Sequence, residues 1–215
     1  MIILLLIISF LIGSIPTGLV IAKLKGVDLR KIGSGNIGAT NVWRVIGKEA
    51  AIITLIGDIA KGAVPIIIAR AFFPDTGLQI SDTGFSVLQF SISNPKSALE
   101  GALGLAAILG HNFSIFLRFK GGKGVATSLG VLLVLSPHVA LITATTWLFI
   151  LNLKGYSSLS SLISFGLLPL SIYLLDYSQE KFAVAIAIAL LIFIRHIPNI
   201  KRLIQGTENK VIKKK

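Results

Sequence analysis

Two glycine-rich stretches hold the residues whose types and spacing could do chemistry. The first, GSGNIGATN, contains Gly33, Gly35 and Gly38 at the G-x-G-x-x-G spacing of a dinucleotide-binding turn. That turn follows a strand, and its acidic partner lies at the end of a second strand. Here a basic linker precedes Gly33, and Asp58, the acid at the expected distance, falls inside an apolar run. A dinucleotide site is therefore the weaker interpretation of this stretch.

The second stretch, FKGGKGVATS, lies at residues 119–128 and resembles a phosphate-binding loop only in part. Its Lys123 is followed by Gly124, where a P-loop needs Ser or Thr. The physical features remain: glycines that leave backbone amides uncovered, two lysines, and an apolar helix that begins directly afterwards. Free amides at a helix N-terminus favour phosphate or another oxyanion. The alternative is an interfacial turn whose lysines reach towards lipid headgroups.

The composition places both stretches in a membrane protein. The chain has 215 residues, of which 53% are hydrophobic and 14% charged, and its mean hydropathy is +0.85. A soluble domain of this size needs more charged surface. The net charge of +12 would suggest nucleic acid in a soluble protein. Here the charges lie between apolar runs, so they are expected to set membrane orientation and attract anions. The absence of cysteine excludes disulfides and a thioester intermediate on the enzyme.

Apolar runs of about 20 residues predict an all-α, polytopic integral membrane protein with about seven transmembrane helices. The uncharged run 124–153 is too long for one helix, so we divide it at Ser136-Pro137. Without this division the count is six. The predicted spans are 2–22, 50–69, 98–117, 120–135, 138–153, 159–175 and 182–197. Residues 1–215 are treated as a single membrane domain.

The distribution of Lys and Arg predicts the orientation. With seven helices and the N-terminus outside, most basic residues fall in the cytoplasmic segments 23–49, 118–123, 154–158 and 195–215. The C-terminus is then cytoplasmic as well. These segments also contain both glycine-rich stretches, whereas the opposite loop 74–97 is Ser-rich without a chemical signature. We therefore expect an anionic ligand to bind at the cytoplasmic membrane surface.

Two further pairs of residues have structural interpretations. Asp58 and Lys61 lie three positions apart on one predicted helix, which favours a buried ion pair. His111 and Asn112 end the third span, where we expect helix packing or support of the site. No carboxylate cluster accompanies any of the three histidines, so a metal site is not expected.

Three motifs in this order give the chain a family resemblance: SGNIGATNVWRVIGK (34–48), FKGGKGVAT (119–127) and RHIPNIKRLIQGTE (195–208). They closely resemble the bacterial acyl-phosphate:glycerol-3-phosphate acyltransferases, the PlsY family, over nearly the whole chain. The resemblance implies transfer of a fatty acyl group from acyl phosphate to the 1-hydroxyl of glycerol 3-phosphate. The products would be lysophosphatidic acid and phosphate, in the first step of bacterial phospholipid synthesis.

The resemblance also implies a setting and a set of site residues. The enzyme would lie in the bacterial inner membrane with its active site on the cytoplasmic face, without a cofactor or metal. Its partners would be acyl phosphate, glycerol 3-phosphate, membrane lipid and the enzyme that makes acyl phosphate, and not nucleic acid. Catalytic roles fall on Ser34, Arg44, Lys123, His196 and Asn199. Substrate-binding roles fall on Asn36, Thr40, Asn41, Lys120, Gly121, Gly122, Gly124, Thr127, Ser158 and Glu208.

Two other functions fit the residues less well. A transporter for a small organic phosphate could use basic loops at its entrance, but transporters place their binding groups near the bilayer midplane, often in repeated halves. No repeat is visible in this sequence. A lipid-binding scaffold without catalytic activity would not explain the placement of Asn and Ser in the three motifs.

Overall fold

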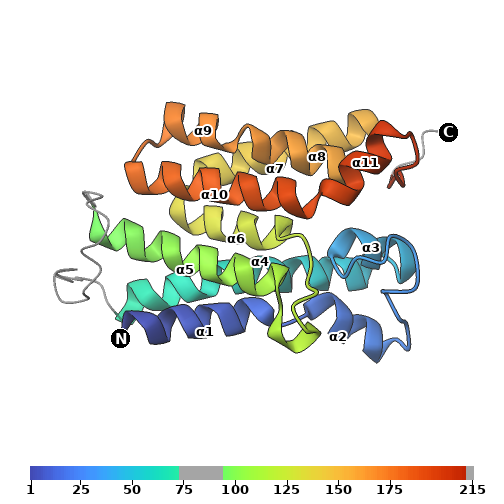
Figure 1. Ribbon diagram of the computed structural model, residues 1–215, viewed down its shortest axis with the longest axis horizontal. Helices are drawn as coiled ribbons and strands as arrows, with labels where there is room; N and C mark the ends of the chain where they lie inside the picture. Colours follow the sequence, from blue (N-terminus) through green and yellow to red (C-terminus); the bar gives the residue numbers. More distant parts are fainter. Residues whose placement is uncertain (73–93, 212–215) are drawn as a thin grey trace.

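Helices make up all the regular structure in the computed structural model, which describes residues 1–72 and 94–211 (Figure 1). The predicted all-α class is confirmed for these residues. The helices are α1 (Ile2–Ser14), α2 (Thr17–Leu24), α3 (Ala39–Val45), α4 (Lys48–Phe72), α5 (Pro95–Asn112), the 3-10 helix η2 (Ile115–Leu117), α6 (Val125–Leu135), α7 (Pro137–Lys154), α8 (Ser157–Gly166), α9 (Leu168–Leu175), α10 (Gln179–Arg195) and α11 (Ile197–Ile204). Most of the Ser-rich loop 74–97 lies outside the described residues.

Prolines mark the breaks between consecutive helices. Pro16 separates α1 from α2, and Pro137 opens α7 directly after α6 ends at Leu135. The predicted division of the run 124–153 is therefore confirmed. Pro169 and Pro198 occupy the first turns of α9 and α11, where a missing N–H costs no hydrogen bond. The breaks that precede these two helices were not predicted.

Fewer helices meet the length and hydropathy of a membrane span than the sequence predicts. Four do so in the described residues: Ile2–Leu24, Lys48–Phe72, Pro95–Leu117 and Ser157–Leu175. The pair α10 and α11, bent by 58°, makes a fifth if it is counted as one span. The apolar α6 has 11 residues, which is short for a crossing. The total of seven spans and the orientation of the termini stay predictions.

Close packing of α4 against α6 fixes the start of α6. A Cβ on Gly62 would lie 2.1 Å from the Thr127 carbonyl oxygen, and one on Gly130 would lie 2.0 Å from that of Ile59. Only glycine allows this approach, which is a common way for membrane helices to pack. The contact continues into a buried core that includes Ile66 and Val131.

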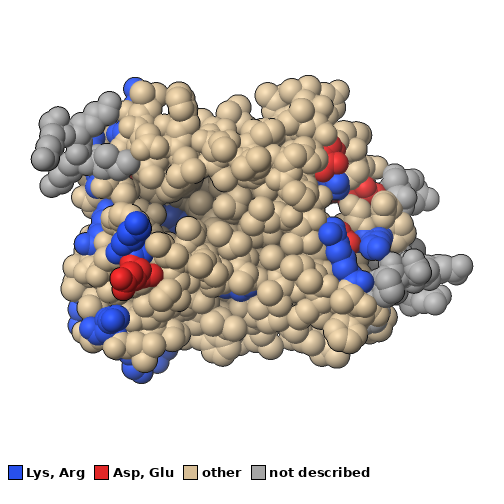
Figure 2. Space-filling view, turned by 180° about the vertical axis from the view of Figure 1, so that it is seen from behind, with Lys and Arg blue, Asp and Glu red and all other residues tan. Residues whose placement is uncertain are grey.

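The basic segments gather at one end of the molecule. Figure 1 shows α2, α3 and α11 at the end away from the N-terminus, together with the chain between α5 and α6. In Figure 2, Lys and Arg lie mostly at the two ends, and a broad band of other residues separates them. Many large apolar side chains are exposed, among them Ile3, Leu141 and Leu174, as expected for a surface that faces lipid.

Candidate active site

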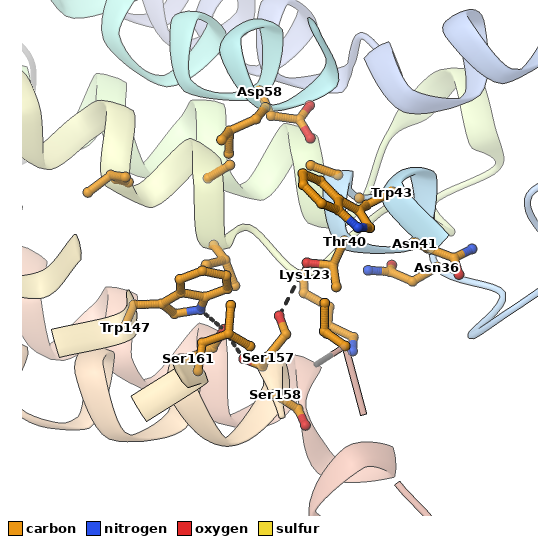
Figure 3. A pocket seen from close by; sticks show the side chains of 18 of the residues that line it. Asn36, Thr40, Asn41, Trp43, Asp58, Lys123, Trp147, Ser157, Ser158 and Ser161 are labelled. Atoms are coloured by element: carbon orange, nitrogen blue, oxygen red, sulfur yellow. Dashed lines mark hydrogen bonds between the residues drawn. The ribbon is translucent and has the colours of Figure 1, made fainter. Parts of the chain in front are cut away.

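A cavity of about 750 Å³ opens between α3, α4, α6, α7 and α8. Figure 2 shows the surface hollowed towards its left end, which is the end of α2, α3 and α11 in Figure 1. In Figure 3, Thr40, Lys123 and Ser158 lie near one end of the cavity, and Trp147 and Ser161 lie further along it. The cavity thus joins a polar end, built from segments distant in the sequence, to an apolar interior.

The structure brings most of the predicted site residues together. The cavity is lined by Ser34, Asn36, Thr40, Asn41, Arg44, Lys123, Gly124, Ser158, His196, Asn199 and Glu208. Four predicted residues, Lys120, Gly121, Gly122 and Thr127, do not line it. Lys120 has an exposed side chain, and Thr127 is fully buried against α4.

The expectation that Gly121 and Gly122 present free amides is wrong. The Gly121 N–H donates to the Asn112 carbonyl at 3.2 Å, and the Gly122 N–H donates to the His111 carbonyl at 3.0 Å. Arg195 donates to both glycine carbonyl oxygens, at 3.0 Å each. These glycines therefore serve the shape of the loop and cannot cradle a phosphate in this conformation.

The amides available to a ligand lie slightly later in the chain, where α6 begins. Ser128 is the first residue of α6 whose N–H makes the hydrogen bond of an α-helix, which it donates to the Gly124 carbonyl at 2.7 Å. The amides just before Ser128 have no such partner in a helix, because the first turn leaves them unpaired. Gly124 and Val125 line the cavity, so this helix N-terminus faces it. The anion site predicted at this helix N-terminus stays a prediction, and the amides that could serve it are those of the first turn of α6.

Arg44 lines the same cavity as this helix N-terminus. One of its terminal nitrogens donates to the Asn209 carbonyl at 3.0 Å. Its Nε is buried, and no group in the described residues accepts its hydrogen. Burial lowers the pKa of Arg44, which the nearby Glu208 carboxylate partly offsets, and arginine stays charged in proteins. A buried donor without an acceptor is suited to an anionic ligand.

A chain of hydrogen bonds connects Lys123 to the C-terminal motif. Lys123 Nζ donates to Asn199 Oδ1 at 2.6 Å, and Asn199 Nδ2 donates to Glu208 Oε1 at 2.6 Å. Ser158 donates to the same oxygen at 2.8 Å, and Arg202 donates to the other carboxylate oxygen at 2.7 Å. Glu208 therefore holds both Asn199 and Ser158 in place by accepting their hydrogen bonds.

The surroundings of Lys123 weaken its hold on a proton. Burial lowers the pKa of Lys123 to about 8, with Arg202, Arg44 and Arg195 acting in the same direction against the opposing Glu208 carboxylate. Repulsion among these cations is relieved when an anion enters, so the site favours a ligand of high negative charge.

Asn41 has a structural role beside its predicted one. Its Oδ1 accepts from the Ser34 N–H at 2.9 Å, and its Nδ2 donates to the carbonyls of Leu29 and Ile32 at 3.3 and 3.2 Å. The amide thus pins the glycine-rich segment against α3. Ser34 is thereby held at the cavity wall.

His196 is held in one orientation. Its Nδ1 lies 2.8 Å from the Ile192 carbonyl oxygen. Because a carbonyl only accepts, Nδ1 carries the hydrogen, and Nε2 of the neutral ring is then an acceptor. The ring is buried and lines the cavity, so it offers a proton acceptor close to the cations.

The residues that line the apolar interior were not predicted from the sequence. Trp43, Trp147 and Phe165 line it, and the Trp147 Nε1–H donates to Ser161 at 3.0 Å. Thr40 and Ser157 meet at 3.2 Å across its polar end. The lining positions on α7 and α8 are Thr143, Ala144, Trp147, Leu148, Leu151, Ser157, Ser158, Ser161 and Phe165. In the sequence, only the spacing of three to four residues marks these positions as one helix face. The lipid-facing positions of the same helices are also apolar, so this spacing does not identify the cavity wall.

This arrangement suits an amphiphilic ligand with an anionic head. Arg44, Lys123 and the α6 N-terminus would hold the charged group, and the apolar walls on α4, α6, α7 and α8 would hold a chain. A carbonyl between the two would lie beside preorganised donors, where negative charge that develops on its oxygen is stabilised.

A family model and individual relatives that match this chain carry the same description. A family model described as glycerol-3-phosphate acyltransferase matches residues 3–206. Proteins named glycerol-3-phosphate acyltransferase match with 43% identity in Geotalea daltonii, covering 96% of both chains, and with 45% identity in Endomicrobium trichonymphae, covering 99% of this chain and 98% of that one.

Solved structures of an integral membrane protein also match. The crystal structure of PlsY (YgiH) in its glycerol 3-phosphate form is similar, with a TM-score of 0.83 and 41% identity over 97% of this chain and 94% of that chain. The lysophosphatidic acid form of the same protein gives a TM-score of 0.81 and 40% identity, with the same coverage. The cavity and these matches agree, and the chain belongs to the glycerol-3-phosphate acyltransferase family.

Proposed function

We propose that the protein transfers a fatty acyl group from acyl phosphate to the 1-hydroxyl of glycerol 3-phosphate, giving lysophosphatidic acid and inorganic phosphate. The observation that supports this most is the union, in one cavity, of Arg44, Lys123 and a helix N-terminus with an apolar interior. The PlsY structures with glycerol 3-phosphate and with lysophosphatidic acid support the acceptor and the product.

The proposed reaction needs no covalent intermediate on the protein. The glycerol 3-phosphate oxygen forms a bond to the acyl carbon, and the bond from that carbon to the phosphate oxygen breaks. The hydroxyl proton passes to a substrate phosphate oxygen or to a nearby acceptor such as His196 Nε2. Aligning the two substrates can contribute about 7–11 kcal/mol, and each key donor to the developing charge about 3–4 kcal/mol.

Named residues have separate roles in this scheme. Arg44, Lys123 and Ser34 bind phosphate groups, with Asn36, Thr40 and the Gly124 amide beside them. Asn199, Ser158 and Glu208 hold Lys123 in place through the hydrogen-bond chain. Asn41 orients Ser34.

We further propose that the protein crosses the bacterial inner membrane seven times, with the N-terminus outside and the site on the cytoplasmic face. The position of α2, α3 and α11 at one end of the molecule, with Arg44, Lys123 and Asn199 lining the cavity, supports this orientation. Acyl phosphate would then arrive from the enzyme that makes it at the same face.

The test is an assay of purified protein with palmitoyl phosphate and glycerol 3-phosphate, without metal or coenzyme A. We expect lysophosphatidate and phosphate in equal amounts, and no product when palmitoyl-coenzyme A replaces palmitoyl phosphate. The reverse preference would refute the proposed donor. A liposome flux assay with glycerol 3-phosphate separates the enzyme from a transporter, which would move the phosphate without consuming acyl phosphate.

A further inference from the structure

A group of buried charges at the wall of the cavity has no part in the reaction as described. Asp58 and Lys61 on α4 form an ion pair at 2.7 Å, and each is about 5% exposed or less. The ion pair predicted from their spacing is thereby confirmed. Breaking such a pair by removing one partner costs about 3–5 kcal/mol, and a well-packed apolar pair is often as stable. The pair therefore calls for an explanation beyond stability.

The ion pair is tied to the break between α1 and α2. Lys61 Nζ donates to the Ile15 carbonyl at 2.9 Å, directly before Pro16. The Thr17 hydroxyl donates to Asp58 Oδ1. The freed carbonyl at the helix break and the first residue of α2 thus fix the position of both charges.

His111 lies between this ion pair and the glycine loop. Its Nδ1 is 3.8 Å from Asp58 Oδ1. On the other side of the ring, a Cβ built on Gly122 would lie only 2.2 Å from Nε2. The His111 carbonyl also accepts the Gly122 N–H at 3.0 Å. His111 therefore contacts the loop at Gly122 with both its ring and its backbone, and these two contacts fix the position of the loop.

The loop at Gly122 leads directly to the groups that bind phosphate. Lys123 and Gly124 follow, and both line the cavity, as do Asp58 and His111. Arg195 fixes the same loop from the opposite side through the Gly121 and Gly122 carbonyls. A displacement of about 1 Å in such a site can cost about 100-fold in rate.

We propose that Asp58, Lys61 and His111 are positioning residues: they place the loop at Gly122 so that Lys123 and the α6 N-terminus meet the substrate phosphates. None of the three touches the reacting atoms. The inference rests on the proposed site and concerns the placement of its phosphate-binding groups, whichever acyl donor the enzyme uses.

A steric double-variant test isolates the contact of His111 with Gly122. The backbone dihedral φ of Gly122 is not in the left-handed region, and the three atoms nearest to a Cβ at this position all belong to the His111 ring, so the ring is the main obstacle to Gly122→Ala. We expect Gly122→Ala to lower kcat/KM by about 100-fold and His111→Ala by about ten-fold. In the double variant the ring is gone, so kcat/KM should recover to about the level of His111→Ala.

Gly121 provides the matched control. A Cβ there would lie 2.0 Å from the His111 carbonyl oxygen, a backbone atom that His111→Ala retains. Gly121→Ala with His111→Ala should therefore show no recovery. Recovery with Gly122 and none with Gly121 supports the proposal. Additive losses in the Gly122 pair, or wild-type kcat and KM in His111→Ala, would overturn it. If His111→Ala does not fold, His111→Ser removes the ring while keeping a polar group.

The ion pair is tested with Asp58→Asn/Lys61→Met, which removes both charges and nearly keeps the volume. We expect a thermal midpoint close to that of the wild type, with kcat/KM at least about ten-fold lower. A purely structural pair would change the midpoint and leave the kinetics of the folded enzyme unaltered, and that result would overturn the proposal.

Glycerol 3-phosphate binding is measured by calorimetry on the same variants. This readout does not depend on the donor, so an error in the proposed acyl phosphate would leave it intact. Affinity should follow the same order as kcat/KM. Equal affinity in the wild type, Gly122→Ala and His111→Ala would contradict the positioning role.

Discussion

Lys123 Nζ lies 2.6 Å from Asn199 Oδ1, although 76 positions separate the two residues in the chain. This contact joins the glycine loop to the segment that follows α10. Asn199 is in turn fixed by Glu208, and Arg44 reaches the backbone at Asn209. The three segments that carry the family motifs therefore form one binding site with a shared set of hydrogen bonds.

The two lysines of the glycine loop should differ sharply. Lys123→Ala removes a cation that lines the cavity and should lower kcat/KM by about 100- to 1000-fold, the usual loss of a preorganised donor. Lys120→Ala should have a small effect, because the Lys120 side chain is exposed and outside the cavity. Steady-state kinetics with both substrates provides the measurement. Similar losses in both variants would mean that the loop binds substrate in another conformation.

The pH dependence should report on Lys123. Burial lowers the pKa of Lys123 to about 8, and the charged form is the one that binds phosphate. The kcat/KM value, which reflects the free enzyme, should fall as the pH rises through about 8. Lys123→Arg should shift this decline to higher pH, because arginine does not titrate in this range. An unchanged alkaline limb in Lys123→Arg would assign the titration to another group.

Replacing Glu208 should lower stability and activity through the residues whose hydrogen bonds it accepts. Glu208→Ala leaves Asn199, Ser158 and Arg202 without their acceptor, which should cost about 1–3 kcal/mol of stability and also lower activity. Glu208→Gln should lose less, because its amide oxygen still accepts. Thermal unfolding and kinetics measure both effects, with Glu49→Gln at the exposed start of α4 as control.

The Glu208 carboxylate should also affect how the stability of the protein changes at low pH. Burial raises the pKa of Glu208, but hydrogen bonds from Asn199, Arg202 and Ser158 outweigh it, so the net pKa lies below its usual range. A lowered folded-state pKa contributes stability at pH values above the unfolded-state pKa, and this is lost as the pH falls through the folded-state value. The acid side of the stability curve should therefore flatten in Glu208→Gln. An unchanged curve would exclude this role for Glu208.

Phe165 should influence which acyl chains are accepted. It is 2% exposed and lines the cavity about two turns of α8 from Ser158. Phe165→Ala should shift the preference towards longer acyl phosphates, at a cost in stability of about 3–5 kcal/mol. Leu167→Ala, at an exposed position of the neighbouring turn, is the control. A chain-length profile from 12 to 18 carbons, in roughly two-carbon steps, measures the shift. An unaltered profile would mean that the chain leaves the cavity before it reaches Phe165.

Hydropathy and proline placement made much of the fold predictable. The division at Ser136-Pro137 agrees with the structure, because a proline disfavours helical backbone at the residue before it, although Pro65 is accommodated inside α4. The last span was expected to end at residue 197, but the helix α11 that follows Arg195 was not predicted, because Pro198, Asn199 and the basic Lys201 and Arg202 suggest a loop. Hydropathy also cannot tell whether an 11-residue helix such as α6 crosses a membrane.

The candidate site was predictable in its residue types and less so in its geometry. Arg44, Lys123 and Asn199 line the cavity as expected. The amides of Gly121 and Gly122 are used by the carbonyls of Asn112 and His111, a tertiary contact that no local pattern reveals. The apolar wall at Trp147 and Phe165 could not be identified from the sequence, because the lipid-facing positions of α7 and α8 also carry large apolar side chains.

Calorimetric titration of glycerol 3-phosphate into the detergent-solubilised protein tests the shared phosphate site most directly. We expect one site per chain in the wild type. Binding should be weakened at least about ten-fold in Arg44→Ala and in Lys123→Ala, and unchanged in Lys25→Ala, an exposed basic position after α2. Wild-type affinity in the double variant Arg44→Ala/Lys123→Ala would contradict the account.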